Sequence, residues 1–512
     1  MTENAALYFV DRHIAEGRGA KTAFREADGD MRSLTYAELA EQSGQFAGAL
    51  VRHGVRREER VAMIVRDQLE FPVAFWGSIK AGAIPVPLNT LLSASVYEAI
   101  LNDSRASILL VSAQLWETVK PALEGNRFLR TVVVIGDAPD GTESYEAFVR
   151  DAEVMDTVEA HGDELAFWLY SSGSTGTPKG VRHIHSSLKA TADTFGTQVM
   201  GIREDDIVFS VAKMFFAYGL GNAVSFPLAM GATTVIFGGR PTPETVLDIM
   251  AEQKPTIFCG VPTLYAALVA EQGKRDTKPE HSIRLCASAG EALPRDIGLR
   301  WEALWGAEIV DGVGSTEMLH IFLSNRPGDV AYGTSGIAVP GYEVRLVDEH
   351  DEDVAEDEVG ELLVRGPSSA DGYWNKRDKS QSTFQGHWTR TGDKYERTEE
   401  GRYVYCGRTD DMFKVSGIWV SPFEVEQALV EFPGILEAAV VARADDKDLV
   451  KPAAFIVLNE GETIDLDALK EHVKAKIGMW KYPRWVTVVD DLPKTATGKI
   501  QRFKLRENEG AT

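Results

Sequence analysis

The hydrophobic pattern in the first third of the chain alternates between helical and strand-like spacing. From Leu34 to Leu50 the apolar residues recur at helical spacing, with Thr35 as the expected N-cap and Glu38 completing a capping box. Short apolar runs predict buried strands over residues 60–65, 83–88, 108–111 and 132–136, and a helix is expected over 71–80. Strands that alternate with helices indicate mainly parallel sheets with both faces covered.

The same rhythm resumes after Ala166 and then changes. Strands are predicted over 166–170, 233–237, 256–259 and 283–288, with a helix over 243–253. Between residues 336 and 405 the pattern becomes short β segments separated by Gly and Asp turns, over 342–347, 360–365 and 402–405. This pattern predicts a small β-rich unit that closes a large N-terminal domain.

After Asp410 the pattern is that of a compact α+β unit. It contains a helix from Pro422, a hairpin-like pair over 437–443 and 453–458, a helix over 466–477 and a strand over 485–489. We therefore expect an α/β protein with an N-terminal domain of layered α/β subdomains, residues 1–409. A small mobile C-terminal domain, residues 410–512, is expected to follow.

Composition places the chain among ordinary globular proteins. Its 512 residues are 44% hydrophobic and 26% charged, and a chain of this length divides into several domains. No apolar run reaches the roughly 20 residues of a membrane span, and the N-terminus lacks the apolar core of a signal peptide. Cys259, Cys286 and Cys406 are scattered, odd in number and without metal-ligand spacing, so we interpret them as small buried residues of a protein in a reducing compartment. We expect a cytoplasmic protein without a membrane partner.

The net charge of −23 restricts the possible partners. Binding to a nucleic-acid backbone needs a basic surface, so a nucleic-acid partner is disfavoured. An anionic small molecule is not excluded, because its binding depends on local donors. The acidic surface mainly indicates solubility.

A Gly/Ser/Thr-rich segment at residues 170–180, YSSGSTGTPKG, follows a predicted strand and precedes a helix-like stretch from about His185. Such a turn exposes backbone N–H groups and hydroxyls to an anion, and Lys179 adds a positive charge. The spacing fits neither a Walker A loop, because Pro178 stands five residues after Gly173, nor a dinucleotide fingerprint. Alone, the segment is also compatible with a plain surface loop.

Further motifs follow this segment in order: SAGEALP at 288–294, DGVGSTE at 311–317, TRTGD at 389–393, GRTDDMFKVSG at 407–417 and PKTATGKIQR at 493–502. Each alone has a structural explanation, such as a turn or a helix cap. Together they resemble the adenylate-forming superfamily, which includes acyl-CoA synthetases, firefly luciferase and the adenylation domains of peptide synthetases.

The resemblance implies a role for each matching residue. The predicted phosphate loop is Ser171, Ser172, Gly173, Ser174, Thr175, Gly176, Thr177 and Lys179. The other residues implied in ATP or AMP binding are Ala289, Gly290, Glu291, Asp311, Gly312, Thr316, Asp393 and Arg408. Within this set Thr316 contacts phosphate and Asp393 and Arg408 contact the ribose. Glu317 would hold Mg²⁺, Lys499 is the catalytic lysine, and Asp410 is the hinge.

The reaction that the resemblance to acyl-CoA ligases implies has two halves. A carboxylate attacks the α-phosphorus of ATP to give an acyl-adenylate and pyrophosphate, and the thiol of coenzyme A then displaces AMP. Two anions must approach each other in the first half, so positive charge near the α-phosphate is needed, which the resemblance assigns to Lys499. In the second half Ser416 and Gly417 would line the pantetheine tunnel, where a side chain would block entry. Lys481 and Arg484 are candidates for the CoA phosphates.

Several stretches are similar to the benzoate-CoA ligase branch, including 167–176, 314–325, 409–417 and the aromatic-rich KMFFAYGLGN at 213–222. The similarity runs from about residue 21 to 506. It implies an acid pocket of Ala217, Tyr218, Phe226, Gly314, His320 and Ile321, whose apolar walls suit an aromatic ring. The chain departs from the benzoate-CoA ligase pattern at Trp419, at 259–262 and around Trp480. The preferred substituents on the aromatic ring of the acid therefore stay open.

Alternatives with the same first half-reaction are an enzyme that loads an aryl acid onto a carrier-protein thiol and a luciferase-like monooxygenase. No carrier domain follows within the 512 residues, which favours free coenzyme A. A non-catalytic AMP sensor is disfavoured by the intact Lys499, Glu317 and Asp393. The resemblance also implies a lysine acetyltransferase and deacetylase acting on Lys499, and a monomer or homodimer.

Overall fold

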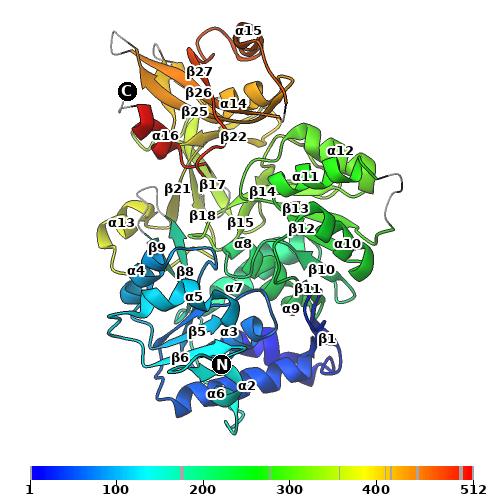
Figure 1. The fold of residues 1–512 in the computed structure, drawn as a ribbon, viewed down its shortest axis with the longest axis vertical. Coiled ribbons are helices and arrows are strands. Elements are labelled where there is room, and N and C mark those ends of the chain that lie inside the picture. The colour runs from blue at the N-terminus through cyan, green and yellow to red at the C-terminus, as the bar shows by residue number, and fades with distance from the viewer. Residues whose placement is uncertain are drawn as a thin grey trace. The chain divides into compact units, whose positions relative to one another are not determined.

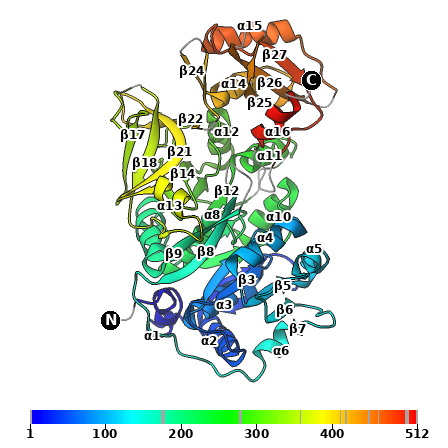
Figure 2. The ribbon, with the colours of Figure 1, turned by 90° about the vertical axis from the view of Figure 1, so that its left-hand side faces the viewer.

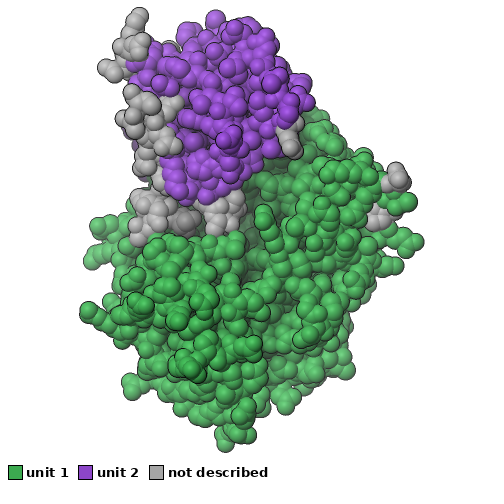
Figure 3. Space-filling model, in the orientation of Figure 1, with its two compact units in different colours: residues 1–344, 364–390 green, residues 345–363, 391–512 purple. Residues whose placement is uncertain are grey.

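The protein is described here from a computed structural model that covers residues 3–172, 178–275, 277, 280–356, 358–409, 411–415, 418–445, 449–459, 461–494 and 500–509. The chain divides into two compact units, which Figure 3 colours separately. The first comprises residues 1–344 and 364–390, and the second comprises 345–363 and 391–512. The predicted domain boundary before Asp410 stays a prediction, because Asp410 lies outside the described residues.

The N-terminal sheet of the first unit is parallel and runs in the order β4-β3-β5-β6-β7. Its strands are β3 (Arg60–Ile64), β4 (Ile84–Pro87), β5 (Ile108–Ser112), β6 (Thr131–Ile135) and β7 (Glu143–Ser144). The expected strands at 60–65, 83–88, 108–111 and 132–136 are confirmed. Each carries a run of buried apolar residues, as a parallel sheet covered on both faces requires.

Helices α2 (Tyr36–Arg52) and α3 (Glu70–Lys80) pack against each other beside this sheet (Figures 1 and 2). The predicted capping box is confirmed: the Thr35 hydroxyl accepts from the Glu38 N–H at 3.2 Å, and the Glu38 carboxylate accepts from the Thr35 N–H at 2.7 Å. The other helical elements of this region are η1 (Leu7–Asp11), α1 (Arg12–Ala15), α4 (Ala94–Ser104), η2 (Ala113–Leu115), α5 (Trp116–Val119), η3 (Lys120–Leu123) and α6 (Tyr145–Val149).

The larger sheet of the first unit runs in the order β16-β15-β14-β13-β12-β10-β11-β1-β2. Its strands are β1 (Thr22–Glu26), β2 (Ser33–Thr35), β10 (Ile207–Ser210), β11 (Thr233–Ile236), β12 (Ile257–Gly260), β13 (Leu285–Ser288), β14 (Ile309–Gly314), β15 (Ile321–Ser324) and β16 (Ile337–Ala338). The stretch from β14 to β1 is parallel, and the pairs at both ends are antiparallel. Loops that follow parallel strands gather at one edge, where α/β proteins bind their ligands.

Three helices cover one face of the larger sheet, and further helical elements belong to the same part of the chain. One face is covered by α10 (Pro243–Gln253), α11 (Pro262–Gln272) and α12 (Arg295–Trp305) (Figure 1). The apolar side chains of these helices share a core with Phe258 and Ile309 of the sheet. The remaining helical elements of this part are α7 (His185–Thr191), η4 (Ala192–Val199), α8 (Ala217–Leu220), η5 (Gly221–Ser225) and α9 (Phe226–Met230).

The predicted phosphate segment lies in a β-hairpin. Strand β8 (Leu165–Ser172) pairs antiparallel with β9 (Pro178–Ile184), with Ser171 opposite Lys179, and β9 pairs with β19 (Gly372–Tyr373). Helix α7 begins at His185 as expected, and strand β9, which the sequence pattern does not predict, lies directly before it along the chain. The sequence of β9 gives little sign of a strand, because only Gly180, Val181 and His183 are buried along it.

The β-rich region contains β17 (Glu343–Val347), β18 (Gly360–Arg365), β20 (Phe384–Gln385), β21 (Trp388–Arg397), β22 (Tyr403–Arg408) and helix α13 (Arg377–Thr383). The expected segments at 342–347, 360–365 and 402–405 are confirmed as β17, β18 and β22. The division between the two units cuts the chain within β17, β18 and β21, so that residues 345–363 and 391–409 count with the second unit.

The rest of the second unit has the expected α+β pattern. Its elements are β23 (Phe413–Val415), β24 (Ile418–Val420), α14 (Pro422–Val430), β25 (Ile435–Ala444), β26 (Val450–Leu458), α15 (Leu466–Ile477), β27 (Trp485–Val488) and α16 (Arg502–Glu509). Strands β25 and β26 form the predicted hairpin, and β27 joins β26 in parallel. Helices α14 and α15 share one core with the sheet, and Leu505 of α16 belongs to another.

Among the helices of the described residues, none has the length and apolar character needed to cross a bilayer.

Candidate active site

Lys179, Glu317 and Tyr373 lie together at the phosphate hairpin. The Tyr373 hydroxyl of β19 donates to Glu317 Oε1 at 2.8 Å, and Lys179 Nζ of β9 lies 3.9 Å from the same oxygen. Lys179 Nζ is also 4.6 Å from the centre of the Tyr373 ring. The structure thus brings the predicted phosphate-binding lysine to the predicted metal carboxylate, with a tyrosine that orients both.

Thr316 is tied to the same hairpin through its backbone. His183 Nε2 donates to the Thr316 carbonyl at 2.9 Å. The His183 ring is buried and stacks on Phe167 of β8, with ring centres 5.1 Å apart. Burial lowers the pKa of His183 to about 4, and its bond to the Thr316 carbonyl opposes that shift. A neutral imidazole therefore holds the segment that carries Thr316 and Glu317.

Two of the predicted nucleotide-binding segments lie at neighbouring parallel strands, one just after β13 and one on β14. Ala289, Gly290 and Glu291 come directly after β13, while Asp311 and Gly312 lie on β14. The strands are in register with Ser288 opposite Asp311, so the two segments lie at the same edge of the sheet.

The carboxyl group of Asp311 is buried at this edge. Its Oδ2 accepts from the Leu293 N–H at 3.3 Å, whereas its Oδ1 has no hydrogen-bond partner among the described residues. Burial raises the pKa of Asp311 to about 7. An acceptor without a donor among the described residues therefore lies next to the segment predicted to bind ATP or AMP.

The predicted acid-binding residues converge on His320, which is 3% exposed. Its ring centre lies 5.6 Å from Tyr218 of α8, 4.6 Å from Phe226 of α9 and 5.0 Å from Phe195 of η4. His320 Nε2 donates to the Tyr218 carbonyl at 3.4 Å. Burial lowers the pKa of His320 to about 3, so that the ring is neutral at ordinary pH. The remaining members of the predicted pocket are Ala217 of α8, Gly314 of β14 and Ile321 of β15.

Two glycines allow this close packing around His320. A Cβ on Gly221 would lie 2.4 Å from His320 Cδ2, and a Cβ on Gly314 would lie 2.5 Å from the His320 carbonyl oxygen. Both distances are shorter than real Cβ contacts. Glycine at these positions therefore lets the helical segment and strand β14 approach the histidine from two sides.

In the second unit the two predicted ribose ligands face each other across β21 and β22. Asp393 and Arg408 are paired in register, and Arg408 Nη1 donates to Asp393 Oδ1 at 2.8 Å. Lys481, a candidate for the CoA phosphates, donates to the Glu424 carboxylate at 2.7 Å. Arg484 lies 3.6 Å from the Tyr482 ring.

Several predicted site residues lie outside the described residues, so their roles stay predictions. These are Gly173, Ser174, Thr175, Gly176 and Thr177 of the loop, the hinge Asp410, the tunnel residues Ser416 and Gly417, and the catalytic Lys499.

Sequence reasoning did not single out His183, Tyr373 or Phe195. His183 and Tyr373 reach the site through strand pairing, and Tyr373 is 56 residues from its partner Glu317. Phe195 had a weak signal, an aromatic residue in an otherwise polar helical stretch. Pairing between distant strands has no local signature in a single sequence.

The Glu317 site fits a magnesium ion that arrives with a nucleotide. Within the described ranges there is no group of three His, Cys, Asp or Glu residues that could hold a metal by itself. Mg²⁺ commonly takes one or two carboxylates and completes its octahedral shell with phosphate oxygens and water. Glu317, partly exposed and fixed by Tyr373, could supply such a carboxylate.

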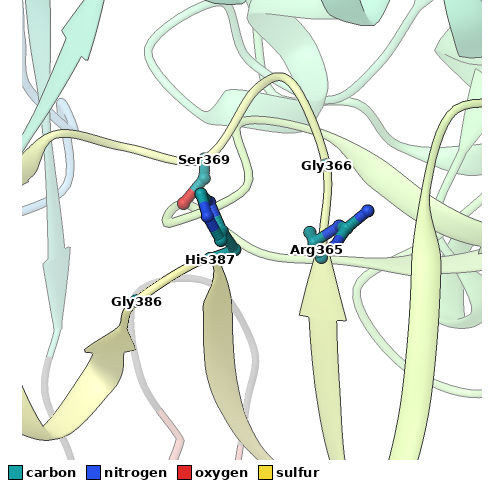
Figure 4. A pocket seen from close by; sticks show the side chains of 5 residues that line it. All are labelled: Arg365, Gly366, Ser369, Gly386 and His387. Atoms are coloured by element: carbon teal, nitrogen blue, oxygen red, sulfur yellow. The ribbon is translucent and has the colours of Figure 1, made fainter.

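A shallow depression of about 440 Å³ lies elsewhere in the first unit. It is lined by Arg365, Gly366, Ser369, Gly386 and His387, and Arg365 extends away from Ser369 and His387 (Figure 4). The Ser369 hydroxyl is bonded to that of Thr389 at 3.0 Å, and Arg365 is paired with Glu343 at 2.7 Å. None of the predicted site residues lines this depression.

Comparison with known families assigns the chain to a class of nucleotide-binding enzymes, in agreement with the fold and with the contacts described above. A model described as AMP-binding enzyme matches residues 11–374, and one described as the AMP-binding enzyme C-terminal domain matches 424–499. The chain belongs to the AMP-binding enzyme family.

Within this family, the chain is similar to several ligases of aromatic acids. The 4-hydroxybenzoate–CoA/benzoate–CoA ligase of Rhodopseudomonas palustris is 51% identical over 98% of this chain and 94% of its own length. The benzoate–CoA ligase of Thauera aromatica is also 51% identical, over 98% and 95%. Among solved structures, a benzoate CoA ligase from Burkholderia xenovorans has 46% identity and a TM-score of 0.89 over 98% of this chain and 99% of its own. An anthranilate CoA ligase in complex with anthranoyl-AMP has 40% identity and a TM-score of 0.93, covering 100% and 98%.

Proposed function

We propose that this protein is an AMP-forming ligase that joins an aromatic carboxylate, benzoate or a substituted benzoate, to coenzyme A. The observation that carries the proposal is the 51% identity to two benzoate-CoA ligases over nearly the whole length of both chains. The ring of aromatic side chains around His320 supports the same substrate class, because flat apolar walls bind an aromatic ring well.

In the first half-reaction a carboxylate oxygen of the acid forms a bond to the α-phosphorus of ATP. The bond from that phosphorus to the bridging oxygen breaks, and pyrophosphate leaves with the electron pair. The nucleophile is already ionised, so no general base is needed. Catalysis then depends on positioning and on positive charge near the phosphates. Lys179 and the residues between β8 and β9 would hold the phosphates, and Lys499 would stand between the carboxylate and the α-phosphate.

Glu317 would bind the Mg²⁺ that accompanies ATP, and the ion would neutralise charge on the phosphate oxygens. Tyr373 donates to one Glu317 oxygen and so fixes the direction of the carboxylate. Thr316 would contact phosphate, in a position held by His183. Asp393 would bind the ribose hydroxyls, and its bond to Arg408 orients it for that role.

In the second half-reaction the thiol sulfur of coenzyme A bonds to the acyl carbon. The bond from that carbon to the phosphate oxygen breaks, AMP leaves, and the thiol proton passes to solvent. Gly417 and Ser416 would line the route of the pantetheine arm. A movement of the residues from 410 onward about Asp410 would remove Lys499 between the two halves.

The experiment that tests the proposal measures pyrophosphate and AMP release over a panel of acids, with and without coenzyme A. The panel holds benzoate, its hydroxy and amino derivatives, cyclohexane carboxylate and short fatty acids. We expect release with aryl acids, and coenzyme A-dependent formation of AMP. Equal activity on aliphatic acids would contradict the aryl assignment, and AMP release with a phosphopantetheinyl carrier protein but not with coenzyme A would favour the carrier-loading alternative.

A substitution of Lys499 tests whether the two half-reactions depend on different residues. Lys499→Ala should lower the rate of pyrophosphate release by about three orders of magnitude or more, because the positive charge between the two anions is lost. Thioester formation from preformed benzoyl-AMP should persist. Equal loss of both activities in a folded variant would contradict the two-conformation mechanism. Mass spectrometry of natively isolated protein would show whether Lys499 is acetylated, as proposed for its regulation.

A further inference from the structure

A stripe of polar side chains runs along one face of the helical segment that carries the predicted acid pocket. Tyr218, Asn222 and Ser225, here called the polar stripe, lie four and three residues apart on the continuous segment formed by α8, η5 and α9. Residues at this spacing share a face of a helix. Phe226 and Gly221, which contact His320, flank the stripe, so that it faces the same side as the acid pocket.

The polar atoms of the stripe are buried and lack partners. Within the described part of the chain, the Tyr218 hydroxyl, both amide atoms of Asn222 and the Ser225 hydroxyl have no hydrogen bond. Asn222 is 1% exposed and Ser225 is fully buried. A buried unpaired polar group costs about 1–3 kcal/mol, and a serine buried within a helix can bond to the carbonyl four residues earlier. Three such side chains in a row therefore need an explanation.

Asn222 and the Tyr218 hydroxyl are neighbours. The Asn222 side chain lowers the pKa of Tyr218 against the larger, opposite effect of burial, although the two groups do not reach hydrogen-bond geometry. The segment widens into the π-helical turn η5 here, a feature that often accompanies ligand sites. Asn222 can donate and accept, and so can a phenol. The stripe is thus equipped for a group that carries both a hydrogen and a lone pair.

The pattern elsewhere in the molecule shows that an unpaired amide is unusual for this fold. Asn325 is equally buried, and its amide donates to the carbonyls of Asp311 and Thr334 and accepts from the Ala331 N–H. Asn4 is 1% exposed and is likewise bonded to Ile79 and Ala6. The chain pairs its buried asparagines where they support structure.

We propose that Asn222 and the Tyr218 hydroxyl bind a hydroxyl or amino substituent on the ring of the aromatic acid, so that the natural substrate range includes hydroxy- or aminobenzoates. The inference rests on the proposed function, because it concerns the ring of the acid that this site would adenylate. Asn222 is then a specificity-determining residue that the resemblance to benzoate-CoA ligases did not assign.

The test compares each hydroxybenzoate with the methylbenzoate substituted at the same ring position. The two substituents are of similar size, so the ratio of their kcat/KM values isolates hydrogen bonding. Wild type should prefer the hydroxyl by about tenfold or more at one or more ring positions, as one well-placed bond implies. In Asn222→Leu, which is close in size and apolar, the ratio at that position should fall to about one. Tyr218→Phe should reduce it as well.

Two controls keep the outcome interpretable. Asn222→Leu removes unpaired atoms and should not lower the melting temperature, whereas Asn325→Leu breaks three bonds and should lower it. If Asn222→Leu does not fold, Asn222→Ser replaces it, because serine is smaller but still polar. This variant should lower the hydroxyl-to-methyl ratio of kcat/KM values only in part. A fall in stability for both Asn222 variants would mean that the amide has a structural role, and would overturn the inference.

The outcomes separate the two proposals. If wild type shows no preference for a hydroxyl at any position, or if the ratio is unchanged in Asn222→Leu, ordered water satisfies the polar stripe and the inference is wrong. Benzoate turnover would in that case still support the proposed function. If no aromatic acid gives coenzyme A-dependent AMP release, the proposed function itself fails.

Discussion

His183 Nε2 donates a 2.9 Å hydrogen bond to the backbone carbonyl of Thr316. Through this bond the second strand of the phosphate hairpin holds the segment that carries Thr316 and Glu317. The low pKa of His183, about 4, keeps the ring neutral, with its Nε2 proton directed to the carbonyl. The bond links two motifs that lie 133 residues apart.

His183→Phe keeps the stacking on Phe167 but removes the donor. We expect pyrophosphate release to slow by roughly tenfold, because a lost hydrogen bond of about 1–2 kcal/mol would let Thr316 shift relative to the phosphates. His183→Gln, whose amide can donate, should recover most of the rate. Equal rates in the two variants would show that the donor does not matter.

Tyr373→Phe removes the hydroxyl that orients Glu317 and leaves the ring beside Lys179. The carboxylate then has more freedom, so the Mg²⁺ concentration for half-maximal pyrophosphate release should rise by about five- to tenfold. The measurement is a magnesium titration at saturating ATP and benzoate. Tyr395→Phe, a buried tyrosine of β21, is the matched control and should leave the titration in place.

Asp311 gives the unfolding free energy a defined pH dependence. Burial raises its pKa from 3.8 to about 7, so between these values the folded state holds a proton that the unfolded chain has lost. Its contribution to stability is therefore present below about pH 4 and is lost as the pH rises through about 7.

Asp311→Asn is uncharged and close in size, and its amide oxygen can still accept from Leu293. Relative to wild type, the variant should gain stability as the pH rises from about 5 to about 8. Urea unfolding of both proteins without ligands measures this difference. A difference that stays constant over the range would show that Asp311 titrates at its ordinary pKa when folded.

Arg502, which is partly exposed, forms an ion pair with the buried Glu426 in the second unit, with nitrogen and oxygen 2.7 Å apart. Glu426 also accepts from the Val440 N–H at 2.7 Å. Arg502→Met leaves a buried carboxylate without its partner and should cost about 3–5 kcal/mol of stability. Adding Glu426→Gln should restore part of this loss, because glutamine carries no charge.

Thermal unfolding of the single and double variants measures that effect. Lys474→Met breaks an exposed pair with Glu471 and is the matched control, with an expected change of less than about 1 kcal/mol. A double variant less stable than Arg502→Met would contradict this account of the pair.

Much of the fold follows from local patterns in the sequence. The Thr35 and Glu38 capping box, the buried strand runs and the hairpin of β25 and β26 depend on neighbouring residues, so periodicity and turn chemistry predict them. Strand β9 was not predicted, because only Gly180, Val181 and His183 are buried along it and this pattern has little periodicity. The order of sheet strands is set by long-range pairing, which periodicity does not contain.

The candidate site divides in the same way. The sequence by itself indicated the class of chemistry, because the phosphate segment, Glu317, Asp393 and the PKTATGKIQR segment belong to ordered motifs that together resemble the adenylate-forming superfamily. It also pointed to an aromatic acid through the KMFFAYGLGN segment.

Tertiary structure alone decided which side chains meet. It brought Tyr373 to Glu317, His183 to Thr316 and Gly221 to His320, and it left Asn222 buried with no partner among the described residues. Motifs are local and can be read along the chain. Hydrogen-bond partners and unpaired groups depend on how distant strands and helices pack, and that packing is settled only when the whole core forms.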